Sequence, residues 1–440
     1  MIHFLKLSIP IILSIVVHYL MPITDLLMIA HLGMISVAAV SISIDLSIVF
    51  SVFPAGIAYG IQPSIEKFNH QTIHENTKWF FNSLFINVLG SIIFSGLLLY
   101  IIHWLPYLKQ DTQAVEMVPY YMPWLACSIF PTMVYNTFCR YLEGIGHTKP
   151  IFIVTMIGLI SNIILNYLFI YVNIGNFTNS LIGAGIATLC SKFIMAIGLM
   201  PYVWKKLETN SKHLLILSYF DREYIKKLLT LGIPIGTQLF LEFFFFSFTG
   251  IMVGSIGVLH KGANSILDNI ISLPIGISWG FSLSASTLVK QTRCSNHKGE
   301  KKSIWIYYGT TGIVMLILAF FIANYSFFIF TVCYKGSATD YSMICSSIPL
   351  AILLIFVDGF YTISLGLLRG LKDTFFPFLI TTISNWLIGI PLCYLLINVI
   401  NFGIPSVWIS KISAFLISGS ILFAQFLKKY YSGPKKLESN

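Results

Sequence analysis

Long apolar runs dominate the sequence and restrict the folds that it can adopt. A helix needs about 20 apolar residues to cross roughly 30 Å of hydrocarbon, and twelve stretches of the 440-residue chain meet this requirement. Charged residues make up only 10% of the chain, whereas soluble domains carry about 25%. The sequence therefore predicts an all-α integral membrane protein. The predicted spans are 8–31, 36–62, 79–105, 117–140, 150–172, 181–204, 228–257, 262–289, 303–332, 341–368, 376–400 and 403–427.

The positions of the basic residues predict how the chain is oriented. Of 27 lysines and arginines, 22 lie in the two ends and the even-numbered loops, and only 3 lie in the odd-numbered loops. Because cytoplasmic loops carry the excess of basic residues, both termini are expected in the cytoplasm. The net charge of +10 is then a topology signal, and a nucleic-acid-binding surface is the weaker alternative.

Several segments of the first half of the chain return in the second half in the same order. This internal similarity indicates a duplication. The matching pairs are LSIP at 7–10 with LGIP at 231–234, Gly33 with Gly257, FPAGIAYG at 53–60 with LPIGISWG at 273–280, and LEGIGHT at 142–148 with LRGLKDT at 368–374.

The duplication predicts the domain organisation. Six helices precede the longest polar connection, and because six is even, both halves enter the membrane from the same side as a parallel repeat. We predict an N-terminal six-helix lobe (1–204), a cytoplasmic linker (205–227), a C-terminal six-helix lobe (228–429) and a cytoplasmic tail (430–440). Transporters built from such repeats carry their substrate between the halves.

Five acidic residues lie within the predicted spans: Asp25, Asp45, Glu242, Asp268 and Asp358. Intramembrane carboxyl groups either join neighbouring helices by hydrogen bonds or take part in function. Asp45 and Asp268, which precede a proline in the second helix of each half, fit the first role better. The other three lie deeper and are candidates for exchanging a proton or binding sodium. No GxxxxGK[ST] motif for ATP binding occurs, so an ion gradient is the expected energy source.

Polar and basic side chains accompany these acids. Asn162 and Asn166 are four residues apart and share one helix face, and together with Thr188 they offer neutral oxygen ligands for a hard cation. Packing through interhelical hydrogen bonds is the alternative explanation. Lys192 and Lys411, each in the last helix of its half, are candidates for pairing with an intramembrane carboxylate.

Several motifs together resemble the multidrug and toxic compound extrusion (MATE) transporters, in particular their bacterial NorM-like branch. They are ITDLLMIAHLG, YLEGIGHTKP, SNIILNYLF, GAGIAT and VDGFYTISLGLLRGLKDT. The resemblance implies twelve transmembrane helices in two six-helix lobes that open to one side as a V. It also implies a secondary active transporter and not an enzyme, without catalytic residues or a bound cofactor.

The resemblance also implies roles for individual residues. Asp25 would be the coupling carboxylate of the N-terminal lobe, with Asn162, Asn166 and Thr188 around it as a sodium or proton site. Glu242 and Asp358 would form a second acidic site in the C-terminal lobe. Pro10 would allow the first helix to bend. Some relatives carry aspartate at the position of Asn166, which leaves the choice between sodium and proton open.

The expected function is an antiporter of the bacterial inner membrane that exports bulky, often cationic or aromatic compounds in exchange for sodium or protons. Its partners would be drug-like molecules and the lipid bilayer, and we expect a monomer that binds no nucleic acid. A flippase of lipid-linked oligosaccharide is the related alternative, although its cavity would need more basic residues. A membrane-bound transferase is disfavoured because the polar residues lie at mid-depth instead of clustering at the membrane surface.

Overall fold

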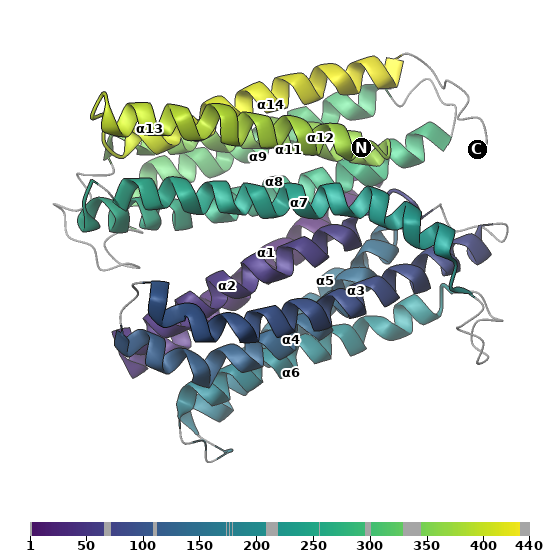
Figure 1. Ribbon diagram of the computed structural model, residues 1–440. Coiled ribbons are helices and arrows are strands. Elements are labelled where there is room, and N and C mark those ends of the chain that lie inside the picture. Colours follow the sequence, from purple (N-terminus) through teal and green to yellow (C-terminus); the bar gives the residue numbers. More distant parts are fainter. Residues whose placement is uncertain are drawn as a thin grey trace. The chain divides into compact units, whose positions relative to one another are not determined.

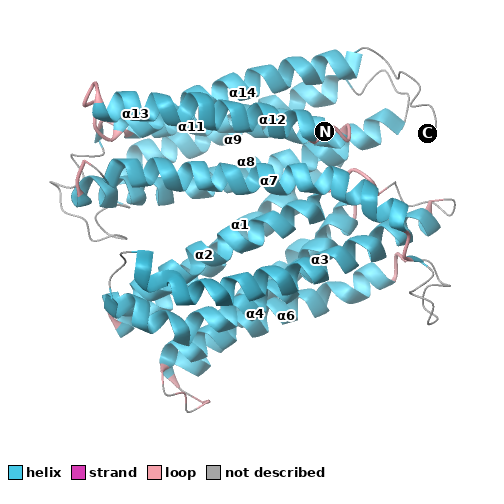
Figure 2. Ribbon diagram, viewed as in Figure 1, coloured by secondary structure: helices cyan, strands magenta, loops and turns pink. Residues whose placement is uncertain are grey.

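The computed structural model describes the chain except for residues 1, 66–71, 109–111, 173, 176, 178, 208–218, 255, 295–300, 329–344 and 432–440. All regular secondary structure in the described residues is helical (Figure 2). Most of the predicted linker and tail, namely 208–218 and 432–440, therefore lies outside the described residues.

The helices follow one another along the chain in the order of their labels (Figure 1). A π-helical turn at Ser384–Gly389 joins α12 to α13 in one continuous run. The bounds are α1 Ile2–Ile29, α2 Met34–Tyr59, α3 Ile73–Ile101, α4 Thr112–Gly144, α5 Lys149–Asn166, α6 Ser180–Trp204, α7 Arg222–Gly254, α8 Val258–Cys294, α9 Lys301–Phe328, α11 Ile348–Gly370, α12 Phe375–Ile383, α13 Ile390–Asn398 and α14 Pro405–Tyr431.

Eleven helical runs in the described residues are long and apolar enough to cross a membrane. The remaining long helix, α4, contains three prolines and ends with the charged residues Arg140 and Glu143. These two side chains are buried and form an ion pair of 2.7 Å within the helix. Because α4 packs against α2, α3 and α6, its polar groups meet protein instead of lipid. Twelve helical runs in the described residues thus correspond to the twelve predicted spans, of which the parts 329–332 and 341–344 lie outside the described residues.

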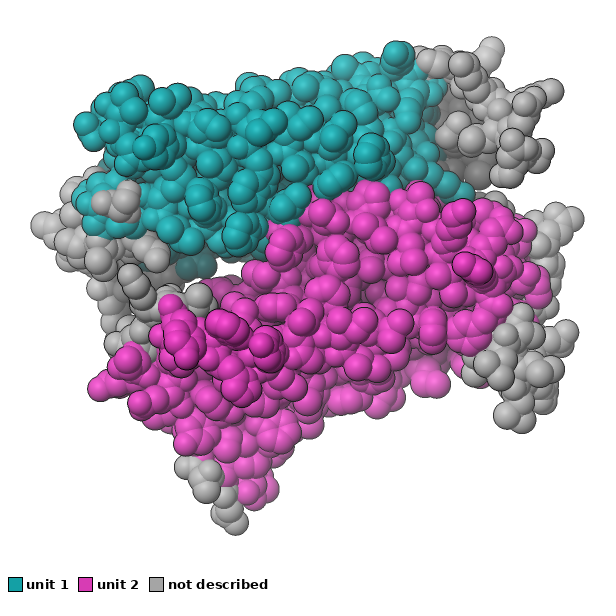
Figure 3. All heavy atoms as spheres, viewed as in Figure 1, with its two compact units in different colours: residues 1–4, 241–440 teal, residues 5–240 magenta. Residues whose placement is uncertain are grey.

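Contacts divide the chain into two compact units, which are coloured separately in Figure 3. One unit comprises residues 5–240, and the other comprises residues 1–4 and 241–440. In the second unit, α11 packs against α8, α9 and α14. The boundary falls inside α7, so the first part of this helix packs with the N-terminal helices. The six-helix lobes 1–204 and 228–429 stay a prediction.

Glycines bring α2 and α7 into backbone contact within the unit 5–240. A Cβ atom added to Gly56 would lie 2.2 Å from the Cα of Gly236, and one added to Gly232 would lie 2.7 Å from the Cα of Ile57. Gly56 on α2 therefore faces Gly236 on α7, and Gly60, directly after α2, faces Gly232. Such small-xxx-small pairs allow membrane helices to approach closely.

A similar contact joins α8 and α11 in the other unit. A Cβ atom at Gly366 would lie 2.2 Å from the backbone oxygen of Ser282, and one at Gly370 would lie 2.5 Å from that of Ser286. Since a backbone oxygen cannot rotate away as a side chain can, the two helices must separate to accept any larger residue.

Gly366→Ala is expected to destabilise the protein by about 1–3 kcal/mol, the usual range for overpacking a tight interior. Gly359→Ala is the matched control on the same helix, because its added methyl group would meet Met315 and Thr311 at ordinary distances of 3.5 Å. Thermal unfolding of the purified variants provides the measurement. Equal melting temperatures for the two variants would contradict the expectation.

Candidate functional site

Three helices of the unit 5–240 converge on Asp25, which α1 places in the interior with only 3% of its surface exposed. Asn166 at the end of α5 donates a hydrogen bond from Nδ2 to Asp25 Oδ1 at 2.6 Å. Thr188 on α6 donates from Oγ1 to Asp25 Oδ2 at 3.0 Å. Both carboxylate oxygens therefore accept a hydrogen bond from another helix.

Asn162 supports this arrangement from one turn earlier on α5. Its Oδ1 accepts hydrogen bonds from Asn166 Nδ2 and from Thr24 Oγ1, each at 3.3 Å. Asn162 thereby holds the amide of Asn166 in place and also ties α5 to α1. All four residues that the sequence placed at the N-terminal site thus come together.

The helix geometry of α5 changes at Asn166. The regular α-helix ends at this residue, and a π-helical turn follows over Tyr167–Tyr171. Such turns occur frequently at functional sites in membrane and soluble proteins. The second half also contains a π-helical turn, Ser384–Gly389, although it begins at the sequence ISN (383–385), whereas the turn of the first half begins five residues after ISN at 160–162.

Sequence reasoning missed Tyr121, a fully buried residue of α4. Its hydroxyl group lies close enough to Asp25 and Thr188 to interact with both. No sequence signal connects the two, because Tyr121 lies on another helix within a proline-rich segment. Tyr121 adds a further polar oxygen beside the carboxylate.

The second acidic group lies in the unit that contains residues 241–440. Tyr361 on α11 donates a hydrogen bond from its hydroxyl to Glu242 Oε2 on α7 at 3.1 Å. Asp358, one turn before Tyr361, is 1% exposed and lies close enough to Glu242 for their charges to interact. The predicted acidic pair therefore shares one neighbourhood, and Tyr361 is a member that sequence reasoning missed.

Both clusters contain buried oxygen atoms that have no hydrogen-bond partner among the described residues. They are Asn166 Oδ1 beside Asp25, and Asp358 Oδ2 in the second cluster. Buried polar oxygens without partners are rare in folded proteins. A carboxylate with neutral oxygens around it can hold a proton or a small hard cation, which is the chemistry of coupling sites in secondary transporters.

The two interior lysines behave differently. Lys411 on α14 forms an ion pair of 2.7 Å with Asp268 on α8, in agreement with the predicted pairing of an interior lysine with a carboxylate. Lys192 on α6 points its Nζ to Met21 Sδ at 3.8 Å, one turn before Asp25. Pro10, the predicted bend, lies inside the continuous helix α1, and its role as a bend stays a prediction.

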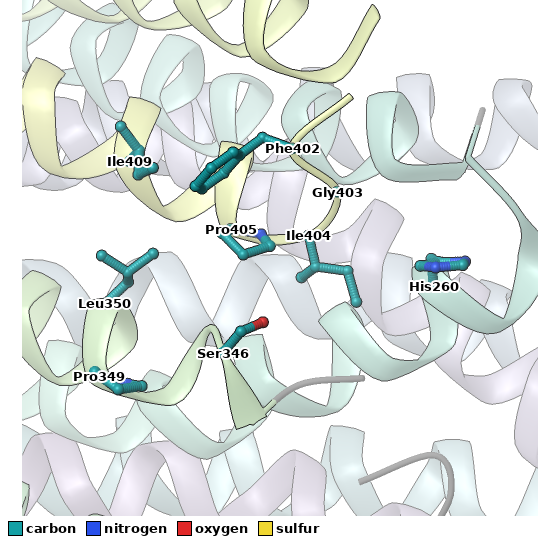
Figure 4. Close-up of a pocket in the computed structure, with 9 residues that line it drawn as sticks. All are labelled: His260, Ser346, Pro349, Leu350, Phe402, Gly403, Ile404, Pro405 and Ile409. Atoms are coloured by element: carbon teal, nitrogen blue, oxygen red, sulfur yellow. The ribbon is translucent and has the colours of Figure 1, made fainter. Parts of the chain in front are cut away.

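A cavity of about 640 Å³ lies in the unit that contains residues 241–440 (Figure 4). It is formed where α8, α11 and α14 begin, and its lining is mainly apolar. None of the predicted site residues contributes to it. The lining residues are His260, Ser346, Pro349, Leu350, Phe402, Gly403, Ile404, Pro405 and Ile409.

Comparison with known proteins matches the chain to one family over most of its length. The MatE family model covers residues 10–168 and 234–395. The probable multidrug resistance protein NorM of Mannheimia succiniciproducens is 24% identical over 96% of this chain and 92% of its own length. The protein of the same name from Photorhabdus laumondii is 26% identical over 94% and 93%, respectively.

The fold agrees with this match. A multidrug resistance MATE family transporter, solved in an outward-facing conformation, superposes with a TM-score of 0.83 at 18% identity. The superposition covers 98% of this chain and 96% of that structure. The chain therefore belongs to the MatE family, the multidrug and toxic compound extrusion transporters, and is a secondary active transporter rather than an enzyme.

Proposed function

We propose that this transporter is an antiporter that exports bulky cationic or aromatic compounds across the bacterial inner membrane in exchange for sodium ions or protons. The carboxylate of Asp25, buried in the membrane and bonded by Asn166 and Thr188, is the observation that carries the proposal. Multidrug resistance relatives that match nearly the whole chain support the class of substrate.

In the proposed cycle, Asp25 and its neighbours bind the coupling ion from the side where the ion is abundant. Asn166 Oδ1 has no hydrogen-bond partner among the described residues and is a ready ligand for sodium, whereas a proton needs only a carboxylate oxygen. Glu242 and Asp358 form the second acidic site and attract the cationic substrate or a second ion. The halves 1–204 and 228–429 act as two lobes of a monomer whose termini lie in the cytoplasm, and α1 bends at Pro10.

A buried positive charge without a carboxylate partner in the C-terminal half would favour anionic, lipid-linked substrates. Lys411 is neutralised by Asp268 at 2.7 Å, so this lysine offers no free positive charge to a pyrophosphate. This pairing favours cationic drugs over the lipid-linked oligosaccharides of the related flippases.

Ethidium transport in vesicles of known orientation tests the proposal. An imposed sodium gradient and an imposed pH gradient are applied separately, and we expect ethidium movement to follow one of them and thereby name the coupling ion. If neither gradient moves ethidium or a second cationic dye, the drug-export proposal is wrong. Gradient-independent movement of a lipid-linked oligosaccharide between leaflets would then indicate a flippase.

A further inference from the structure

The ammonium group of Lys411 is held in an aromatic cage in the unit that contains residues 241–440. Its Nζ lies 4.7 Å from the ring centre of Phe246 on α7 and 4.8 Å from that of Trp408 on α14. Asp268 Oδ1 on α8 closes the cage at 2.7 Å. Two aromatic faces and a carboxylate are the elements with which proteins recognise organic ammonium groups.

The carboxylate of the cage is accessible, whereas the lysine is not. The side chain of Asp268 is 32% exposed, and that of Lys411 is 0% exposed. Asn264 fixes the orientation of the carboxylate by donating a hydrogen bond from Nδ2 to Asp268 Oδ2 at 2.8 Å. A cation that approaches from outside the cage therefore meets Asp268 first.

Polar residues surround the accessible side of Asp268. Ser265 and Asn269 are exposed, and Ser272 is partly exposed, so these residues and Asp268 form one polar face on α8. Because an exposed carboxylate is not stable in hydrocarbon, such a face at membrane depth lines a water-filled path. The cage is therefore expected to open toward water.

We propose that Asp268, Phe246 and Trp408 form a binding subsite for the ammonium group of a transported compound, and that Lys411 occupies this subsite until the compound displaces it. The inference rests on the proposed export of cationic compounds and names residues outside both acidic clusters that recognise them. The lysine ammonium is compact and is carried on a flexible four-carbon stem, so it can leave without moving a helix.

An internal occupant has a functional consequence. It keeps the carboxylate of Asp268 neutralised when no substrate is bound, and the fully buried ammonium group of Lys411 has a partner in this state, which avoids an unpaired buried charge. Lys411 also competes with every ligand for the subsite, so the affinity for the transported compound stays low enough for the compound to be released. The matching lysine of the first half, Lys192, contacts Met21 instead and has no aromatic cage in the described part of the chain.

Equilibrium binding of benzyltrimethylammonium to the purified protein in lipid nanodiscs tests the subsite without any gradient. Lys411→Met removes the competitor but keeps the cage, so we expect binding about tenfold tighter than in the wild type. Asp268→Asn should weaken binding about tenfold, and the double variant should lose the gain. Lys411→Arg should retain wild-type affinity. Lys227→Met, which removes a lysine at an exposed position of α7, serves as the control with no change.

A well-folded Lys411→Met variant that binds the ligand no more tightly than the wild type would overturn the proposal and leave the ion pair as structural. A second measurement on the wild type covers the case in which this variant does not fold. Displacement should expose the amine, so benzyltrimethylammonium should increase acetylation of Lys411 several-fold by mass spectrometry; unchanged acetylation contradicts displacement. If the protein fails these tests but still exports ethidium along a gradient, only the subsite proposal is wrong and the proposed function stands.

Discussion

Asp25→Asn is expected to reduce gradient-driven ethidium transport to the level of vesicles that lack the protein. The amide keeps the size of the side chain, and its single oxygen can accept the hydrogen bond from Asn166. Its NH2 group can donate to Thr188 Oγ1, whose hydroxyl can turn to the carbonyl of Ala184. The amide can neither take up a proton nor neutralise a cation. Losing one partner of a buried ionic contact costs about 3–5 kcal/mol, which corresponds to a fall of at least about 100-fold in ion affinity.

Asp45→Asn is the matched control, because it makes the same change on α2 at an exposed position outside the Asp25 cluster. It should retain most of the transport. The melting temperature of Asp25→Asn should equal or exceed that of the wild type, since a neutral amide is easier to bury than a carboxylate. If transport by Asp25→Asn still followed the ion gradient, we would assign the coupling role to Glu242 and Asp358 instead.

Hydropathy predicts which segments form helices but not where the helices end. The span predicted at 262–289 is part of a helix that runs from Val258 to Cys294, because lysine, arginine and glutamine continue a helix into water as readily as apolar residues do in lipid. The same reasoning cannot detect the π-helical turns at Tyr167–Tyr171 and Ser384–Gly389, which depend on packing with neighbouring helices.

The part of the candidate site that lies within one helix could be predicted from the sequence, whereas the contacts between helices could not. Spacing within one helix is local, so the common face of Asn162 and Asn166 follows directly from their four-residue separation. Tyr121 and Tyr361 reach their carboxylates from other helices. The sequence contains no periodicity that spans such distances, and only the fold brings these groups together. For the same reason the sequence could not identify Asp268 as the partner of Lys411, because any of the five intramembrane carboxylates was a candidate.

The glycine contact between α2 and α7 leads to the second large effect. Gly236→Val is expected to disrupt the conformation described here, because even the first carbon of the new side chain would lie 2.6 Å from the backbone oxygen of Phe53. The two helices must separate to accept it. Overpacking of about 3 kcal/mol lowers the population of a conformer on the order of 100-fold. A transporter that must pass through this conformer in each cycle should slow correspondingly.

Gly250→Val provides the matched control on the same helix, since a Cβ atom there meets nothing within 4 Å. Both variants place a β-branched residue in α7 and carry the same intrinsic helix penalty, so any difference between them reports the contact with α2. We expect ethidium transport to fall at least about tenfold in Gly236→Val relative to Gly250→Val at equal expression. Equal transport would mean that α2 and α7 do not need to meet through these glycines during the cycle, and that this close contact belongs to a state the transporter can bypass.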